Sequence, residues 1–108
     1  MNEIYAEVEP ARGDIDALKD ATVIEFGAPW CPHCQNAQPL IASAFSKHPQ
    51  LRHIKIEDGP GRRLGRSFRI KLWPTLIFMK DGVEIDRLVR PQESTAIAQA
   101  MTALDGLS

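Results

Sequence analysis

The sequence predicts an α/β protein with a mixed central β-sheet that helices cover on both faces. An apolar run, residues 22–26, is followed by the motif C-x-x-C at Cys31 and Cys34 and then by a helical pattern. Strand-like and helix-like segments alternate along the chain, which is typical of a sheet with helices on its faces. The dipeptide Asp81-Gly82 separates two more strand-like segments and predicts a hairpin, and a last helical pattern follows it.

The first half of the chain is expected to contain two strands and two helices. Residues 4–8 alternate weakly and predict a first strand at the edge of the sheet, and residues 14–20 predict a short helix with Ile15 and Leu18 inward. Residues 22–26 are β-branched or aromatic and predict a buried strand. Residues 35–48 have the three-and-four apolar spacing of a helix, which Pro39 should kink by removing one hydrogen bond.

The second half is expected to contain three strands and two helices. Residues 51–57 predict a strand with one better-buried face, and residues 58–61 a turn. Residues 62–68 predict a short basic helix with Leu64 and Phe68 inward. Residues 74–80 and 83–89 predict the hairpin, and residues 92–104 a closing helix with Ile97, Met101 and Leu104 on its core face.

The two cysteines are the chain's only ones, and they lie where the core strand leads into a helix. Cys31 is expected at or before the first helical turn, where unpaired N–H groups and the positive end of the helix dipole meet. That position stabilises an anion, so we expect Cys31 to be reactive as a thiolate near neutral pH. Pro32 fits the first turn because its missing N–H loses no hydrogen bond there.

Two other readings of C-x-x-C compete with a redox dithiol. A structural zinc site needs four ligands, and neither His48 nor His53 completes one by spacing. A pair of inert buried cysteines is the other reading, but Trp30 and two prolines flank the motif instead of core residues. We therefore expect a redox dithiol and no metal.

The size of the chain, 108 residues, predicts a single domain over residues 1–108. No apolar stretch is long enough to span a membrane, and the acidic N-terminus does not resemble a signal peptide. We therefore expect a cytoplasmic protein, in a compartment where a lone C-x-x-C is more often catalytic than structural. Five bases lie in residues 62–71, and such a run is more often the solvated face of a helix than a nucleic-acid surface, so we expect a solvated helix face and no nucleic-acid partner.

A strand, Trp-Cys-Pro-His-Cys, a helix, and a later Trp-Pro-Thr before a hairpin together resemble the thioredoxin family. Glu25 matches the family's buried carboxylate, Pro39 its helix-kinking proline, and Pro74-Thr75 the segment with the cis-proline. The resemblance implies a thioredoxin-like three-layer sandwich whose last hairpin is antiparallel to the rest of the sheet. It also implies a cis Pro74 and a Trp73 backbone that pairs with an extended substrate peptide.

The resemblance further implies a thiol–disulfide oxidoreductase, a protein-disulfide reductase with a role in electron transport and cell redox homeostasis. Cys31 would attack a substrate disulfide, Cys34 would resolve the mixed disulfide, and Glu25 would accept the Cys34 proton through water. His33 could stabilise the Cys31 thiolate. The expected substrate-binding residues are Trp30, Pro32, Trp73, Pro74 and Thr75. The expected partners are disulfide-containing proteins and a thioredoxin reductase or other thiol electron donor, with a monomeric protein and no cofactor beyond the Cys31–Cys34 couple.

Several residues depart from the family pattern and bear on the substrate. Pro-His between the cysteines looks like the oxidising periplasmic disulfide-forming family, and Gly27 stands where thioredoxins often have tryptophan. His53 falls where a lysine often neighbours the buried carboxylate, and the usual glycine near residues 89–90 is missing. Two alternatives therefore remain: a peptide-binding chaperone or maturation adaptor, and a more oxidising oxidase or isomerase.

Overall fold

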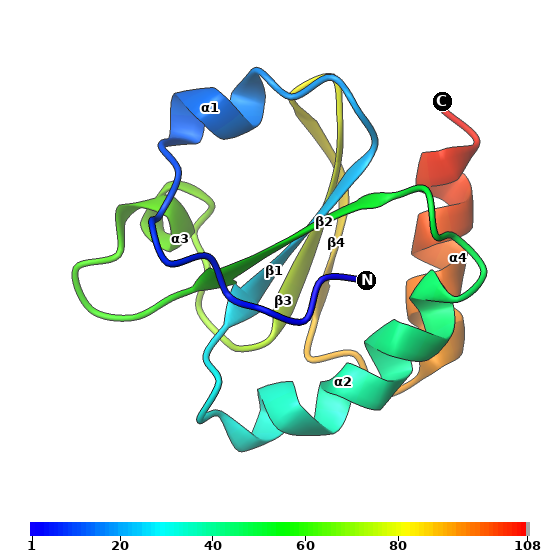
Figure 1. The fold of residues 1–108 in the computed structure, drawn as a ribbon, viewed down its shortest axis with the longest axis horizontal. Helices are drawn as coiled ribbons and strands as arrows, with labels where there is room; N and C mark the ends of the chain where they lie inside the picture. Colours follow the sequence, from blue (N-terminus) through cyan, green and yellow to red (C-terminus); the bar gives the residue numbers. More distant parts are fainter. Residues whose placement is uncertain (108) are drawn as a thin grey trace.

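The computed structural model describes residues 1–107 and contains a four-stranded mixed sheet in the order β2-β1-β3-β4. The elements are α1 (Arg12–Asp16), β1 (Thr22–Gly27), α2 (Pro32–Phe45), β2 (Arg52–Glu57), α3 (Arg63–Ser67), β3 (Thr75–Lys80), β4 (Val83–Val89) and α4 (Ser94–Asp105). Figure 1 shows the sheet crossing the centre of the molecule with the helices around it. The predicted α/β class and three-layer arrangement are confirmed.

The strand directions follow from the connections. β1 and β2 are joined through α2 and run parallel, whereas β3 is antiparallel to both of its neighbours, β1 and β4. The expectation that the whole hairpin opposes the rest of the sheet therefore holds for β3 only, because the two strands of a hairpin must run in opposite directions. Asp81 and Gly82 both have positive φ, 52° and 73°, as the predicted tight hairpin turn requires.

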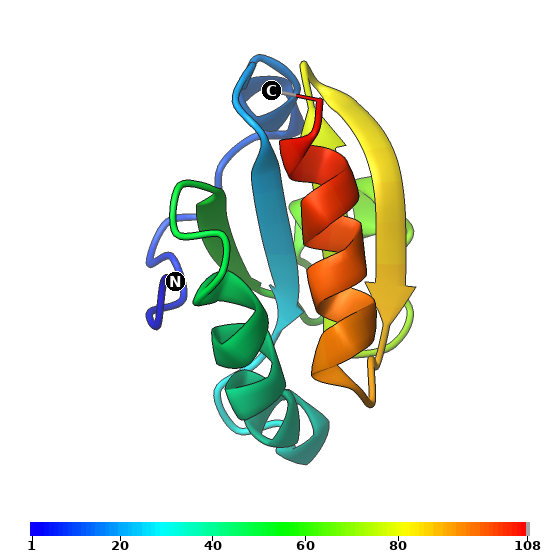
Figure 2. The ribbon, with the colours of Figure 1, turned by 90° about the vertical axis from the view of Figure 1, so that its right-hand side faces the viewer.

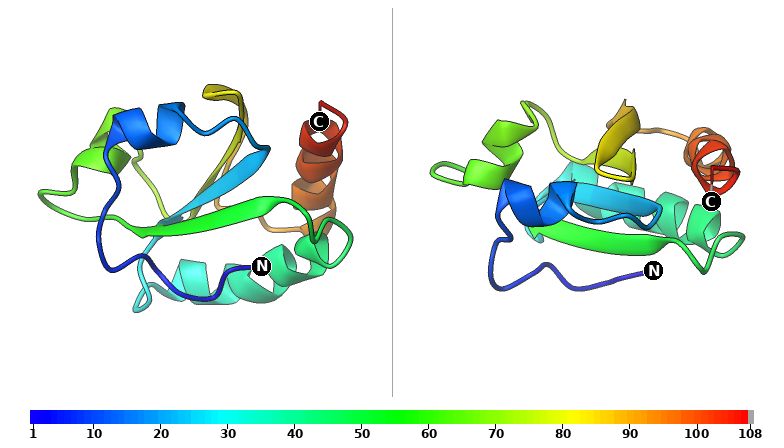
Figure 3. Two further views of the ribbon diagram at one scale, coloured as in Figure 1. Left: turned by 45° about the horizontal axis from the view of Figure 1, so that its top comes forward. Right: turned by 90° about the horizontal axis from the view of Figure 1, so that it is seen from above.

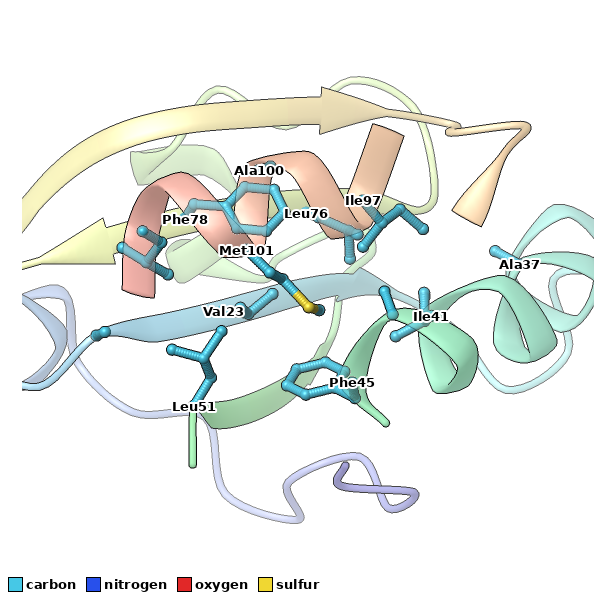
Figure 4. Packing of buried hydrophobic residues seen from close by; sticks show 13 residues of the cluster. Val23, Ala37, Ile41, Phe45, Leu51, Leu76, Phe78, Ile97, Ala100 and Met101 are labelled. Carbon is cyan, nitrogen blue, oxygen red and sulfur yellow. The ribbon is translucent and has the colours of Figure 1, made fainter. Parts of the chain in front are cut away.

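Helices α2 and α4 cover one face of the sheet, and α1 and α3 cover the other (Figures 2 and 3). Under α2 and α4, side chains from both helices meet those of β1 and β3 in one apolar cluster (Figure 4). The closing helix presents Ile97, Met101 and Leu104 to this core, as predicted. On the opposite face Leu64 and Phe68 are buried, again as predicted. β1 is thus buried on both sides.

Two predictions for the N-terminal region are wrong. Residues 4–8 form no strand: Ile4 and Val8 are exposed, and this segment gives β2 a single backbone hydrogen bond, from Ala6 N–H to Lys55 O at 2.9 Å. The first helix spans Arg12–Asp16, whereas the prediction placed it at residues 14–20, so it ends four residues earlier than predicted. Residues after it turn toward the hairpin instead, where Asp81 N–H donates to Lys19 O.

Candidate active site

The two cysteines lie where β1 leads into α2. Cys31 is the N-cap of α2, and its Sγ accepts the backbone N–H of Cys34 at 3.2 Å. Pro32 occupies the first turn, as predicted. An N-cap side chain that accepts such a bond satisfies one of the helix's free donors, and a thiolate does this better than a neutral thiol. The local fold therefore favours negative charge on Cys31.

Cys34 is one helical turn further along and more deeply placed. The exposed fraction is 1% for Cys34 and 5% for Cys31, and both cysteines are free thiols. Burial, together with a hydrogen bond to Cys31, raises the pKa of Cys34 to about 12. Cys34 therefore holds its proton at neutral pH and needs a base before it can act as a nucleophile.

Glu25 is fully buried on β1, on the face that α2 covers. Its Oε1 accepts from His53 Nε2 at 3.0 Å, and its Oε2 accepts from Gln38 Nε2 at 2.8 Å. Lys55 Nζ lies 3.9 Å from Oε2. All of these partners are donors, which is the environment a carboxylate needs when no water reaches it.

The surroundings also fix which atoms donate. The backbone N–H of Asn2 donates to His53 Nδ1 at 2.9 Å, so the His53 proton is on Nε2, which faces Glu25. Lys55 Nζ donates to Gln38 Oε1 at 3.0 Å, which turns the Gln38 amide nitrogen toward Glu25 and the carbonyl of Cys34. Gln38 therefore links the buried carboxylate to the backbone of the second cysteine.

Lys55 corrects one reading of the sequence. The sequence places His53 where a lysine often lies near the carboxylate, but the structure has both a histidine and a lysine there: Lys55 is the register partner of Glu25 across the parallel strands. β2 has one better-buried face, as predicted: Leu51 and Lys55 are buried on one side, whereas on the other Arg52 is exposed and only Ile56 is buried. A lysine in a strand with alternating apolar residues is usually solvated, so only the parallel register could have indicated this one.

Tyr5 is a site residue that the sequence did not indicate. Its ring lies under Lys55 Nζ, 4.5 Å from the ring centroid, and its hydroxyl approaches Gly27 and Cys34. Burial raises the pKa of Tyr5, and the charges of Glu25 and the cysteines together with a hydrogen bond to Cys34 raise it further. A Cβ at Gly27 would lie 2.6 Å from Cys34 Sγ and 3.2 Å from the Tyr5 hydroxyl. The second cysteine and Tyr5 thus occupy the space that a side chain at residue 27 would need.

Two tryptophans form one rim above Cys31. Trp30 is 66% exposed and meets Trp73 edge to face, with ring centroids 5.5 Å apart. Trp73 Nε1 donates to Asp58 at 3.0 Å, and Trp73 packs against the buried cluster formed by Ala28 and the two cysteines. The peptide bond between Trp73 and Pro74 is cis, as the resemblance implied, and Thr75 begins β3. These residues are brought beside Cys31 from a distant part of the sequence.

His33 and Pro32 are exposed on the first turn of α2. His33 lies on the other side of Cys31 from the Glu25 network and lines a hollow together with Pro74 and Arg90. The structure thus brings Cys31, Cys34 and Glu25 together under one helix, while His33 faces solvent.

Within residues 1–107, no group of three or more His, Cys, Asp or Glu side chains is placed to hold a metal ion. None of the described helices has the length and apolar character needed to cross a membrane.

Comparison with known proteins agrees with this geometry. The thioredoxin family model matches residues 9–103. The chain belongs to the thioredoxin family. Its fold matches the reduced form of thioredoxin 2 from Pseudomonas aeruginosa PAO1, with 50% identity, a TM-score of 0.88 and complete coverage of both chains. Thioredoxins in general act on disulfide substrates and are reduced by thioredoxin reductase.

Plant relatives match over shorter segments. Thioredoxin H5 of Arabidopsis thaliana is 34% identical over 76 residues, which are 70% of this chain and 64% of that protein. Thioredoxin H5 of Oryza sativa is 37% identical over 67 residues, 62% of this chain and 50% of that protein. The match thus spans between half and two thirds of these relatives' own length.

The two thiols should differ in their response to pH. In Cys31→Ser, burial still raises the pKa of Cys34, so alkylation by iodoacetamide should be slow at pH 7.5 and should rise about tenfold per pH unit toward about 12. In Cys34→Ser, Cys31 should react readily at pH 7.5. Mass spectrometry measures both rates, and urea-unfolded samples should show no difference. Equal rates in the two folded variants would contradict the geometry.

Gly27→Ala should destabilise the protein by about 1–3 kcal/mol, because its methyl group has to displace Cys34 Sγ and the Tyr5 hydroxyl. Gly13→Ala is the matched control: Gly13 is in α1 with nothing within 4 Å of the added methyl, so up to about 1 kcal/mol of stabilisation is expected. Urea unfolding of the reduced proteins measures both changes. A Gly27→Ala protein as stable as Gly13→Ala would show that Tyr5 does not occupy this space.

Proposed function

We propose that this chain is a thiol–disulfide oxidoreductase that reduces disulfides of other proteins through Cys31 and Cys34. The observation that carries the proposal is the pair of free thiols at the start of α2, with Cys31 as N-cap and Cys34 beneath it, next to a buried carboxylate. Family membership supports the same chemistry.

The reaction begins at Cys31. Its thiolate attacks one sulfur of a substrate disulfide, forms a mixed disulfide, and releases the other substrate sulfur as a thiolate. Cys34 then loses its proton and attacks Cys31 Sγ, which releases the second substrate thiol and leaves the Cys31–Cys34 disulfide. Two electrons pass to the substrate, and the protein is oxidised.

Glu25 is the proposed base for the second step. Its negative charge contributes to the raised pKa of Cys34, so the two groups interact electrostatically. Transfer of the Cys34 proton toward Glu25 removes this repulsion as the thiolate forms. His53 and Gln38 donate to the carboxylate and hold it in place. His33, at the exposed end of the helix, is proposed to stabilise the Cys31 thiolate by charge or hydrogen bonding.

The substrate chain is proposed to lie across Trp73, Pro74 and Thr75, with Trp30 and Pro32 on its other side. Among residues 1–107 no backbone acceptor is paired with the Trp73 amide, which leaves that N–H for an extended peptide. The Trp73 carbonyl already accepts from Arg90 Nε at 2.7 Å, so a peptide would use its second lone pair.

The proposal extends to the setting of the reaction. The oxidised protein would be reduced again by a thioredoxin reductase or another thiol donor, as part of electron transport and cell redox homeostasis. It would act as a monomer in the cytoplasm, with the dithiol as its only redox group and no metal or nucleic-acid partner.

Turnover should depend on both cysteines in different ways. Wild-type protein should precipitate insulin in the presence of dithiothreitol. Cys31→Ser should be inactive, whereas Cys34→Ser should accumulate mixed disulfides through Cys31 that are visible on non-reducing gels. Equal activity of Cys31→Ser and wild type would contradict the enzyme and favour the peptide-binding adaptor.

Glu25→Gln should slow the release of the mixed disulfide by about tenfold to a hundredfold, because Cys34 loses its base. Its formation should be little changed, and stopped-flow kinetics separates the two steps. Glu57→Gln is the control, since Glu57 ends β2 in a partly exposed ion pair with Arg62. If Glu25→Gln changes both steps equally, or matches Glu57→Gln, Glu25 is not the base.

A further inference from the structure

A polar hollow of about 240 Å³ opens between the first turns of α2, which follow Cys31, and the segment that carries Pro74. Its lining includes His33, Asn36, Leu40, Pro74, Arg90 and Gln92. These residues come from α2, from the segment just before β3 and from the segment between β4 and α4. A group bound there would lie next to a disulfide that Cys31 attacks, because His33 is only two residues from the nucleophile.

Arg90 is held in an unusual conformation at this hollow. Its φ is 48°, in the left-handed region that residues other than glycine rarely adopt. Its backbone N–H donates to Pro74 O at 2.8 Å, and its Nε donates to Trp73 O at 2.7 Å. Both bonds are to the segment that carries the cis-proline. The guanidinium is therefore fixed at the edge of the hollow instead of extending freely into solvent.

The charge of Arg90 is not neutralised by any side chain of residues 1–107. Arg12, Arg52, Arg62 and Arg87 each pair with a carboxylate, but within residues 1–107 no carboxylate lies within ion-pair distance of Arg90. Its Nε is used by Trp73, so its two terminal NH₂ groups remain as donors. No acidic residue lines the hollow, and His33 adds a second group that can donate. A carboxylate is the ligand that two parallel guanidinium donors match in shape and charge.

We propose that this hollow binds a carboxylate of the substrate, so that the protein prefers disulfides with an acidic side chain one or two residues from the reacting cysteine. The inference rests on the proposed reductase function and adds a substrate class to it. The guanidinium is positioned before the substrate arrives, so little side-chain order is lost on binding. Trp73 O and Pro74 O, which hold Arg90, belong to the segment across which the substrate chain would lie. The same contacts that fix the arginine therefore place it beside the peptide.

The test compares matched peptide disulfides that differ only by Glu or Gln, placed one or two residues before or after the cysteine. Wild-type protein should reduce the best-placed Glu peptide with a kcat/KM about tenfold above its Gln partner, as expected for a hydrogen-bonded charge pair. Added salt should reduce this ratio. Arg90→Gln should bring the ratio close to one.

Arg69→Gln is the matched control. Arg69 is also an arginine with positive φ, 56°, but it is exposed and does not line the hollow. It should leave the ratio unchanged. If Arg69→Gln lowers the ratio as much as Arg90→Gln, or if Arg90→Gln leaves it intact, the specific site is wrong. Arg90→Gly, which tolerates the positive φ, should also abolish the preference and serves if Arg90→Gln proves unstable.

A second readout separates this inference from the reductase function. The tryptophan fluorescence of a Cys31→Ser, Cys34→Ser variant should report tighter binding of the Glu peptide than of the Gln peptide, and Arg90→Gln in that background should remove the difference. Discrimination in binding without turnover in wild type would overturn the reductase function and keep the site. Equal turnover of both peptides would overturn the carboxylate site and keep the reductase function. Glutathione disulfide and its ethyl ester, compared in the same way, show whether a small carboxylate-bearing disulfide uses the hollow too.

Discussion

The burial of a carboxylate beneath the dithiol is the constraint on which the site depends. Glu25 has no exposed surface, and a charge without water has to be met by donors from the protein. Its partners come from α2, from β2 and, at one remove, from the N-terminal segment through Asn2. The parallel pairing of β1 with β2 is what brings Lys55 opposite Glu25. A change of register by one residue would turn the lysine to the other face and leave the carboxylate without that charge.

The N-terminal segment is therefore part of the site, although it forms no regular element. It lies along the free edge of β2 (Figure 2), where Ala6 makes the one backbone bond to that strand. Tyr5 reaches from this edge to Cys34 and covers the space above Gly27. Gly27 thus leaves the space that the Tyr5 hydroxyl fills, because a side chain at residue 27 would compete with that hydroxyl for the same volume.

The sequence predicted the parts of the site that depend on local chemistry. C-x-x-C before a helical pattern gave the N-cap position of Cys31, and Asp81-Gly82 gave the hairpin turn, because spacing and backbone preference determine both. Tyr5 and Lys55 could not be found in this way, since their roles depend on contacts between segments that are distant in the sequence. Residues 4–8 misled because the alternating apolar residues Ile4, Ala6 and Val8 are all exposed, and the only partly buried residue among residues 4–8 is Tyr5, which lies between them.

The two sides of the site differ in a way that bears on what it can bind. Above Cys31, Trp30 and Trp73 form an aromatic rim that Asp58 holds in place. Across the cysteine, His33 and Arg90 line a polar hollow. The hydrogen bond from Arg90 Nε to Trp73 O connects the two sides. Trp73 forms part of the aromatic rim, and its carbonyl also holds the charged side chain of Arg90 at the hollow. A substrate chain that crosses Cys31 therefore meets an apolar surface and a cation held at a set separation. Selectivity then depends on the residues that flank the disulfide as well as on the disulfide itself.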